Sequence, residues 1–195
     1  MKQEETFNPQ ESMQVISSMI ITAKNKLADD GFALIFWGWL VTLSAHIHYF
    51  TILLNIDYGY FVWPVLMPLG GIVSAYIGYK QGKKKKVKTY IDTYLSYLWI
   101  AFGVSLAITL IFMPLHGIKT TYFFLMVLYG IATLVSGGIL NFKPLIVGSI
   151  FSFICAVVSV FLGEKEQLLI IAIALICSYI IPGHMLRSKF KSQNV

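Results

Sequence analysis

The chain has 195 residues, enough for one soluble domain, but its composition excludes that class. Charged residues make up 12% of the chain and the residues AVILMFWYC 57%, whereas soluble domains carry about 25% charge. Mean hydropathy is +0.73. A domain of this size has too little interior to shield so much apolar surface from water, so we expect an integral membrane protein.

Residues 1–30 form the longest polar segment and contain the pattern of a helix start. Asn8 suits an N-cap, and Pro9 suits the first helical position because its missing N–H is not needed there. Apolar side chains then recur every three or four residues, which predicts an amphipathic helix that ends near residues 29–31, Asp-Asp-Gly. We expect its apolar stripe to contact lipid headgroups or a cytoplasmic partner protein through Met13, Ile16, Ile20 and Leu27.

Six uncharged runs follow this segment. Each is at least about 20 residues long, the length that a helix needs to cross a hydrocarbon core of about 30 Å. The runs are apolar on all faces, unlike the alternating strands of a membrane β-barrel. The sequence therefore predicts an all-α polytopic membrane protein with six transmembrane helices in antiparallel hairpins, at about 31–54, 61–79, 94–115, 120–140, 143–162 and 168–186. Its expected parts are a cytoplasmic segment (1–30), a transmembrane domain (31–187) and a cytoplasmic tail (188–195).

Lysine and arginine indicate the orientation, because they collect on the cytoplasmic side of a membrane. With both termini inside, the inner segments hold twelve of these residues from Lys24 onward, whereas the outer loops hold only Lys119 and Lys165. We therefore expect a bacterial cytoplasmic (inner) membrane protein with both termini in the cytoplasm.

The longest basic run, KQGKKKKVK, covers residues 80–88 between the second and third spans. Its main expected role is to anchor the topology, and it also suits contact with anionic lipid. The run lacks interleaved aromatic residues and a folded basic module, so we expect no nucleic-acid partner. The residues expected to contact headgroups or a partner are Lys83, Lys84, Lys85, Lys86 and Lys88.

The second span, FVWPVLMPLGGIVSAYIGYK, is the most irregular. Two prolines each remove a backbone hydrogen bond and two glycines follow, which predicts a kink or a short unwound stretch. Broken helices form solute sites in some transporters, whereas small residues four apart more often serve close helix packing, within one chain or between copies in a homo-oligomer. The residues of this expected kink or solute path are Pro64, Pro68, Gly70, Gly71 and Ser74.

Chemistry-bearing residues are scarce in the spans. No acidic or basic side chain lies deep in a run, which disfavours an ion-coupled transporter. No nucleophile, Walker-type or metalloprotease motif occurs, so we expect no enzyme and no cofactor. His46, His48 and His116 are the only candidates for an outer metal or proton-sensing site, which requires the first helix to end near residue 45.

Several short motifs in the first half of the chain carry a resemblance. NPQES, FWGW, PVLMPLGGI, KTYID and LWIAFG occur in this order within residues 8–103. In these motifs the chain resembles a group of small uncharacterised multi-span inner-membrane proteins of Bacteroidota-type bacteria. The resemblance implies a cytoplasmic-membrane protein with no assigned enzyme activity and no catalytic residues.

Three functions remain open from the sequence. The leading hypothesis is a non-enzymatic accessory or signalling component of the membrane whose cytoplasmic side engages a partner protein or anionic lipid. The alternative is a small channel or transporter for a neutral or weakly polar solute. A third, a lipid-active enzyme, depends on the three histidines named above.

Overall fold

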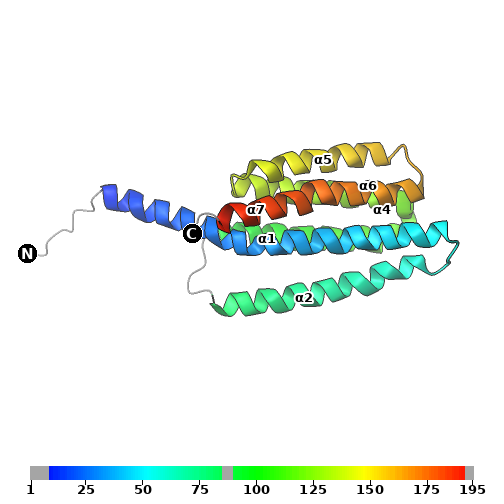
Figure 1. The fold of residues 1–195 in the computed structure, drawn as a ribbon, viewed down its shortest axis with the longest axis horizontal. Coiled ribbons are helices and arrows are strands. Elements are labelled where there is room, and N and C mark those ends of the chain that lie inside the picture. The colour runs from blue at the N-terminus through cyan, green and yellow to red at the C-terminus, as the bar shows by residue number, and fades with distance from the viewer. Residues whose placement is uncertain (1–8, 85–89, 192–195) are drawn as a thin grey trace, which may run out of the picture.

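The computed structural model describes the backbone of residues 9–84 and 90–191, and side chains for 13–15, 17, 31–80, 83 and 92–189. Every regular element in these ranges is helical, which confirms the all-α part of the expected fold class (Figure 1). The elements are α1 (Pro9–Leu53), the turn η1 (Gly59–Phe61), α2 (Val62–Lys84), α3 (Tyr90–Ile111), α4 (Met113–Ile139), α5 (Lys143–Ser159), α6 (Glu164–Leu175), the π-helical segment η2 (Ile176–Ile180) and α7 (Ile181–Lys191).

Within the described residues, five helical stretches are long and apolar enough to cross a membrane. The run α6–η2–α7 forms one of them, because the three elements follow each other without a break. Helix α5 is equally apolar in character but has only 17 residues. The five stretches are Gly31–Leu53, Gly59–Lys80, Asp92–Ile111, Met113–Ile139 and Glu164–Lys189.

The helices divide into a central bundle and a peripheral pair. The central bundle consists of α1, α4, α5 and α6–η2–α7, which pack side by side, whereas α2 packs on α1 and α3 packs on α4 (Figure 1). About half of the membrane-length windows in α1, α4 and α6–α7 is buried, compared with 6% in α2 and in α3. The largest fully buried side chains of the central bundle include Val41, Met126, Leu145, Ile171, Leu175 and Tyr179.

Small residues allow the closest approach inside the central bundle. A Cβ on Gly148 would lie 2.7 Å from the carbonyl oxygen of Cys177 and 2.8 Å from the Cα of Ser178. Residue 148 must therefore be glycine for α5 to reach the backbone of η2. On α2, by contrast, a Cβ at Gly71 or Gly78 would meet no described atom within 4 Å. Gly148 of α5 therefore has the expected role in close helix packing, whereas Gly71 and Gly78 of α2 do not.

The expected helix end at residues 29–31 is wrong, since α1 continues to Leu53. Gly31 is buried, and a Cβ there would contact the Gly183 carbonyl of α7 at 3.5 Å. Packing on α7 keeps the backbone helical where sequence alone suggests a turn. The helix does begin at Pro9, as predicted, and its first half extends beyond the bundle (Figure 1).

The unwound stretch expected as one possibility in the second span is absent, because α2 is helical throughout Val62–Lys84. Pro64 lies in the first turn, where its missing N–H has no partner to lose. Pro68 deprives only the carbonyl of Pro64, one turn earlier, of its donor. The irregular backbone lies elsewhere, at η2 and at Gly117 in α4, whose φ of 81° and ψ of 164° suit glycine.

Candidate functional site

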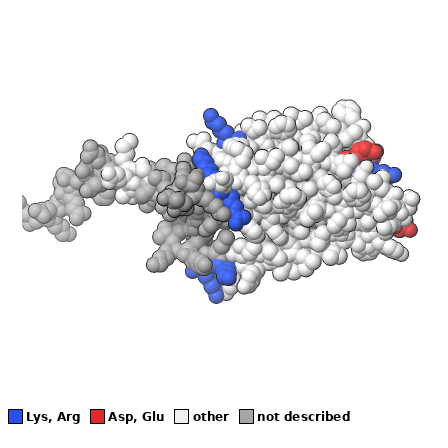
Figure 2. All heavy atoms as spheres, viewed as in Figure 1, with Lys and Arg blue, Asp and Glu red and all other residues white. Residues whose placement is uncertain are grey.

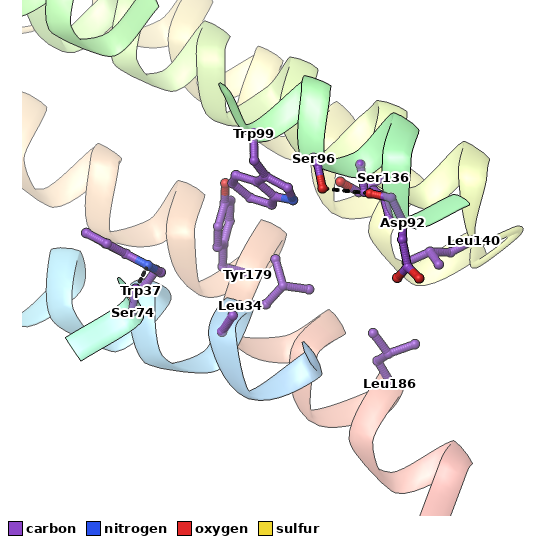
Figure 3. A pocket seen from close by; sticks show the side chains of 12 residues that line it. Leu34, Trp37, Ser74, Asp92, Ser96, Trp99, Ser136, Leu140, Tyr179 and Leu186 are labelled. Carbon is purple, nitrogen blue, oxygen red and sulfur yellow. Dashed lines mark hydrogen bonds between the residues drawn. The ribbon is translucent and has the colours of Figure 1, made fainter. Parts of the chain in front are cut away.

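A cavity of about 330 Å³ lies between the central bundle and the peripheral pair (Figure 3). Its walls come from α1, α2, α3, α4, η2 and α7. The cavity therefore forms only when helices distant in sequence come together. Asp92 in the first turn of α3 and Leu186 near the end of α7 mark one limit of the cavity. The site is therefore displaced toward that end of the bundle.

Three aromatic side chains form its walls. The indole N–H of Trp37 donates a hydrogen bond to Ser74 Oγ at 2.9 Å, which fixes the wall on α1 to the one on α2. The Trp99 ring meets the edge of Phe102 with 5.5 Å between ring centroids, and Tyr179 meets Tyr129 in the same way at 5.5 Å. These edge-to-face contacts hold the rings in defined orientations.

Two residues of the cavity wall carry buried hydroxyl groups that have no hydrogen-bond partner among the described residues. They are Ser136 Oγ, on a side chain 3% exposed, and the Tyr179 hydroxyl, on a side chain 1% exposed. Both oxygen atoms are themselves buried, so neither is open to the cavity, although other atoms of the two residues line it. Thr42 Oγ1 and Gln167 Oε1 are buried without a partner in the same way but lie outside the cavity wall.

The π-helical segment η2 positions Tyr179. Such segments are rare and occur mostly as single turns, often at functional sites. Pro182 is the second residue of α7, directly after η2. It has no N–H to donate to the preceding turn. This proline inside an apolar run is the signal in the sequence from which the irregularity between α6 and α7 could have been predicted.

The interior of the cavity carries little charge. Among its described lining residues, Asp92 alone is formally charged. Its carboxylate points toward Leu140 and Leu186 at the rim, while its backbone carbonyl accepts a 2.7 Å hydrogen bond from Ser96 Oγ (Figure 3). A carboxylate in the first turn of a helix is favoured by the helix dipole.

The expected solute path on α2 contributes one residue to this cavity. Ser74 lines it and is held by Trp37. Pro64, Pro68 and Gly71 are exposed, and Gly70 is buried against the Leu40 side chain of α1. Ser74 is therefore the one residue of this expected path that lines the cavity. The unwound backbone expected to form a solute site is absent from α2.

The three histidines have separate environments. His46 Nδ1 lies 2.8 Å from the backbone carbonyl one turn earlier in α1. His48 Nδ1 accepts a 3.0 Å hydrogen bond from the indole N–H of Trp63, and the His116 ring lies 6.0 Å from that of Phe124. In the part of the chain that the structure describes, no three His, Cys, Asp or Glu residues are placed to hold one metal ion. Because α1 stays helical past residue 45, His46 and His48 face different directions.

Most of the expected headgroup contacts fall at the margins of the described chain. Lys83 Nζ lies 4.5 Å above the ring of Tyr79. The side chain of Lys84, together with Lys85, Lys86 and Lys88, lies outside the described residues. On α1, Met13 is 74% exposed, while the side chains of Ile16, Ile20 and Leu27 also lie outside them.

Charge is distributed unequally between the two ends of the bundle. Figure 2 shows blue Lys and Arg side chains gathered at one end, and red acidic side chains together with blue at the other. The basic end is formed where α2 and α7 finish and α5 starts, and it carries Lys80, Lys83, Lys143, Arg187 and Lys189. The cavity lies in the half of the bundle nearer this end, because Leu186 lines it.

Comparisons with known proteins give no match to a family model, to a curated protein or to a solved structure. The resemblance of residues 8–103 to Bacteroidota-type membrane proteins stays a prediction. The function must be argued from the cavity and from the charge at the ends of the bundle.

Proposed function

We propose that this chain is a non-enzymatic integral membrane protein that binds a neutral or weakly polar small molecule in the cavity between α2 and α3. The observation that carries the proposal is the cavity itself, whose wall combines three aromatic rings with the serines Ser74 and Ser96. Aromatic walls with a few polar groups are typical of small-molecule sites, and 330 Å³ lies within their usual range.

Binding is better supported than passage through the bundle. Val41, Ala45, Met126 and Ile171 are buried to 1% exposure or less and pack in one cluster. Such a packed interior favours a site that opens sideways, between α2 and α3, over a continuous path from one face to the other. A channel or transporter for the same class of solute is the alternative.

The proposed topology has six spans with antiparallel neighbours and both termini in the cytoplasm of a bacterial inner membrane. Helix α5 rises about 26 Å at about 1.5 Å per residue, and a turn to Leu162 continues it. This length approaches the hydrocarbon thickness, so in the proposed topology α5 also crosses the membrane and brings the number of spans to six. The basic end faces the cytoplasm under the positive-inside rule.

The test is to obstruct the cavity and to identify what remains bound. Ala33 lines the cavity, and Ala107 is its exposed counterpart on the outer face of α3. Native mass spectrometry of the protein in its own lipids should detect a small molecule on the original chain and on Ala107→Trp, but not on Ala33→Trp. Identical bound molecules in all three proteins would refute the proposal.

A second function, an accessory component that engages anionic lipid or a partner protein, is favoured by the charge at the basic end (Figure 2). Basic residues near a membrane surface attract anionic lipid by about 1 kcal/mol each. We expect Lys80→Gln with Lys83→Gln to reduce retention of phosphatidylglycerol, measured by native mass spectrometry. Lys119→Gln with Lys165→Gln, at the other end, is the matched control. Equal losses from both pairs would argue against this function.

A further inference from the structure

We propose that His48 and Trp63 form a proton-operated latch between α1 and α2. The latch lies at the end of the bundle opposite the basic end, where α1 finishes and α2 begins (Figure 1). It is closed while the imidazole of His48 is neutral. Acid at this end opens it, because a protonated His48 no longer holds the indole of Trp63, and the start of α2 then separates from α1.

The hydrogen bond between the two side chains determines the charge of His48. An indole N–H only donates, and the Trp63 ring nitrogen lies 3.0 Å from His48 Nδ1. Nδ1 is therefore the acceptor and carries no proton, so the proton of the neutral ring is on Nε2. A doubly protonated ring has an N–H at Nδ1 as well, and two N–H groups would then face each other. Protonation thus abolishes this bond and does not merely weaken it.

His46, two residues earlier on α1, has the opposite arrangement. Its Nδ1 lies 2.8 Å from the Thr42 carbonyl oxygen, which only accepts, so this nitrogen carries a proton and donates the hydrogen bond. A second proton on the other nitrogen of His46 would leave that bond intact. Of these two neighbours, therefore, His48 loses its side-chain partner on protonation and His46 does not.

Water reaches one side of the His48 ring. The side chain is 7% exposed, and a Cβ at Gly59 of η1 would lie 3.3 Å from its Cδ2. Among the described residues Nε2 has no hydrogen-bond partner, yet it is not one of the buried polar atoms left without one, so it contacts solvent. The closed contact keeps a proton off Nδ1. Acid therefore acts by binding to the open form and shifting the population toward it.

Histidine is the group around the latch that titrates between about pH 5 and pH 8. On α2 there is no titratable side chain before Tyr76. The neighbouring tyrosines are uncharged in this range: Tyr49, Tyr60 and Tyr122, whose ring lies 6.5 Å from that of Trp63. The charged side chains of the adjoining loop, α4 and α6 are exposed, so water and salt screen them: Asp57, Lys119, Glu164, Lys165 and Glu166. Apart from His46, the other histidine at this end is His116, whose ring packs on Phe124.

Helix α2 is held loosely enough for one bond to matter. Its membrane-length window is 6% buried, and near its start the bond from Trp63 to His48 joins it to α1. Farther along, the hydrogen bond of Ser74 and the packing of Gly70 hold the other half of α2 on the same helix. Opening the latch therefore lets α2 pivot about this second attachment, so that its start moves and its end stays.

The experiment measures the position of α2 in the full chain, in lipid nanodiscs, between about pH 8 and about pH 5. Electron–electron double resonance reports the distance between nitroxides at Val65 and Val157, in a background without the two native cysteines. A second pair, at Tyr79 and Val147 near the basic end, is the control, and all four of these side chains are exposed. We expect the first distance to lengthen and broaden in acid, and the second to stay the same. The ratio of open to closed form should rise by up to about ten-fold per pH unit, the limit for one proton.

Variants assign the response to the latch. His48→Asn supplies a neutral acceptor that does not titrate, so the distance should no longer depend on pH. Trp63→Phe removes the donor, so α2 should be open at both ends of the pH range. His46→Asn is the matched control and should respond as the original chain does. Thermal unfolding of each variant establishes that it is folded.

The outcomes decide the inference without reference to any molecule in the cavity. An unchanged distance between residues 65 and 157 in the original chain overturns it. A response that persists in His48→Asn or in Trp63→Phe also overturns it, because another group must then be titrating. The comparison of Ala33→Trp with Ala107→Trp tests the proposed function separately, so the latch and the proposed function can fail independently.

Discussion

The central bundle and the peripheral pair have similar hydropathy but differ in what covers them. Mean hydropathy is 1.8 in the membrane-length window of α3 and 1.8 in that of α4, yet 6% of the first and 50% of the second is buried. In a membrane, lipid replaces protein as the apolar surroundings, so hydropathy does not report protein packing. The difference indicates that contact between these helices depends on small residues and on the shape of the helix surfaces. Four substitutions test this comparison.

The largest effect is expected for Gly148→Leu in the central bundle. The new side chain would overlap the backbone at Cys177 and Ser178, so the free energy of unfolding should fall by about 3 kcal/mol. Reversible unfolding in mixed micelles measures it. Gly78→Leu, on the open face of α2, is the matched control and should change stability by less than about 0.5 kcal/mol. Comparable losses would show that α2 is packed as tightly as α5.

Met126→Ala should destabilise the protein by about 2 kcal/mol, because Met126 is fully buried and its removal leaves a cavity. Ile72→Ala on the peripheral pair, where Ile72 is 66% exposed, should have almost no effect. The same unfolding assay measures both. A smaller loss at Met126 than at Ile72 would reverse the comparison between the two regions.

Tyr179→Phe should stabilise the ligand-free protein by about 1 kcal/mol, since it removes a buried hydroxyl that has no partner among the described residues. Reversible unfolding in mixed micelles measures this gain. A loss of stability in the ligand-free protein would indicate that the hydroxyl already has a partner.

The smallest effect is expected for Trp37→Phe, which removes the hydrogen bond to Ser74 that joins α2 to α1. Hydrogen bonds between membrane helices average about 0.6 kcal/mol, so the loss should be of this size. Accessibility of a cysteine placed at residue 71 on α2 reports whether α2 moves. Unchanged accessibility and stability would show that Gly70 packing alone holds α2.

Hydropathy predicted the helical fold and the approximate membrane stretches because a bilayer demands long apolar helices regardless of their neighbours. Pro9 likewise marked the start of α1, since the rule for a first helical position is local. The unwound stretch expected from the prolines of α2 is absent, because Pro64 lies in the first turn, where a proline disturbs little. At residues 29–31 contact with α7 outweighed a local turn pattern.

The cavity itself could not be predicted from one sequence. Trp37, Trp99, Ser136 and Tyr179 come from four elements and meet only after the bundle has formed. Nothing in the sequence distinguishes Ser136 from the other serines, because what matters is the hydrogen bond it does not make to its own helix. Ser74 was singled out for its place in an irregular span, and it does line the cavity.

The π-helical segment η2 also determines the rotational setting of α7. Each residue turns an α-helix by about 100°, and a π turn accommodates one residue more than an α turn. With η2 in place, Gly183 faces Ile35 of α1, with 2.8 Å from a Cβ there to the Ile35 Cγ1, and Leu186 is 2% exposed. A regular α-helix with the same number of residues would rotate this face away from α1 by about 100°, whereas deleting one residue between 176 and 180 would remove the π turn and keep the face in place. The length of one turn thus decides which side of the last helix meets the first.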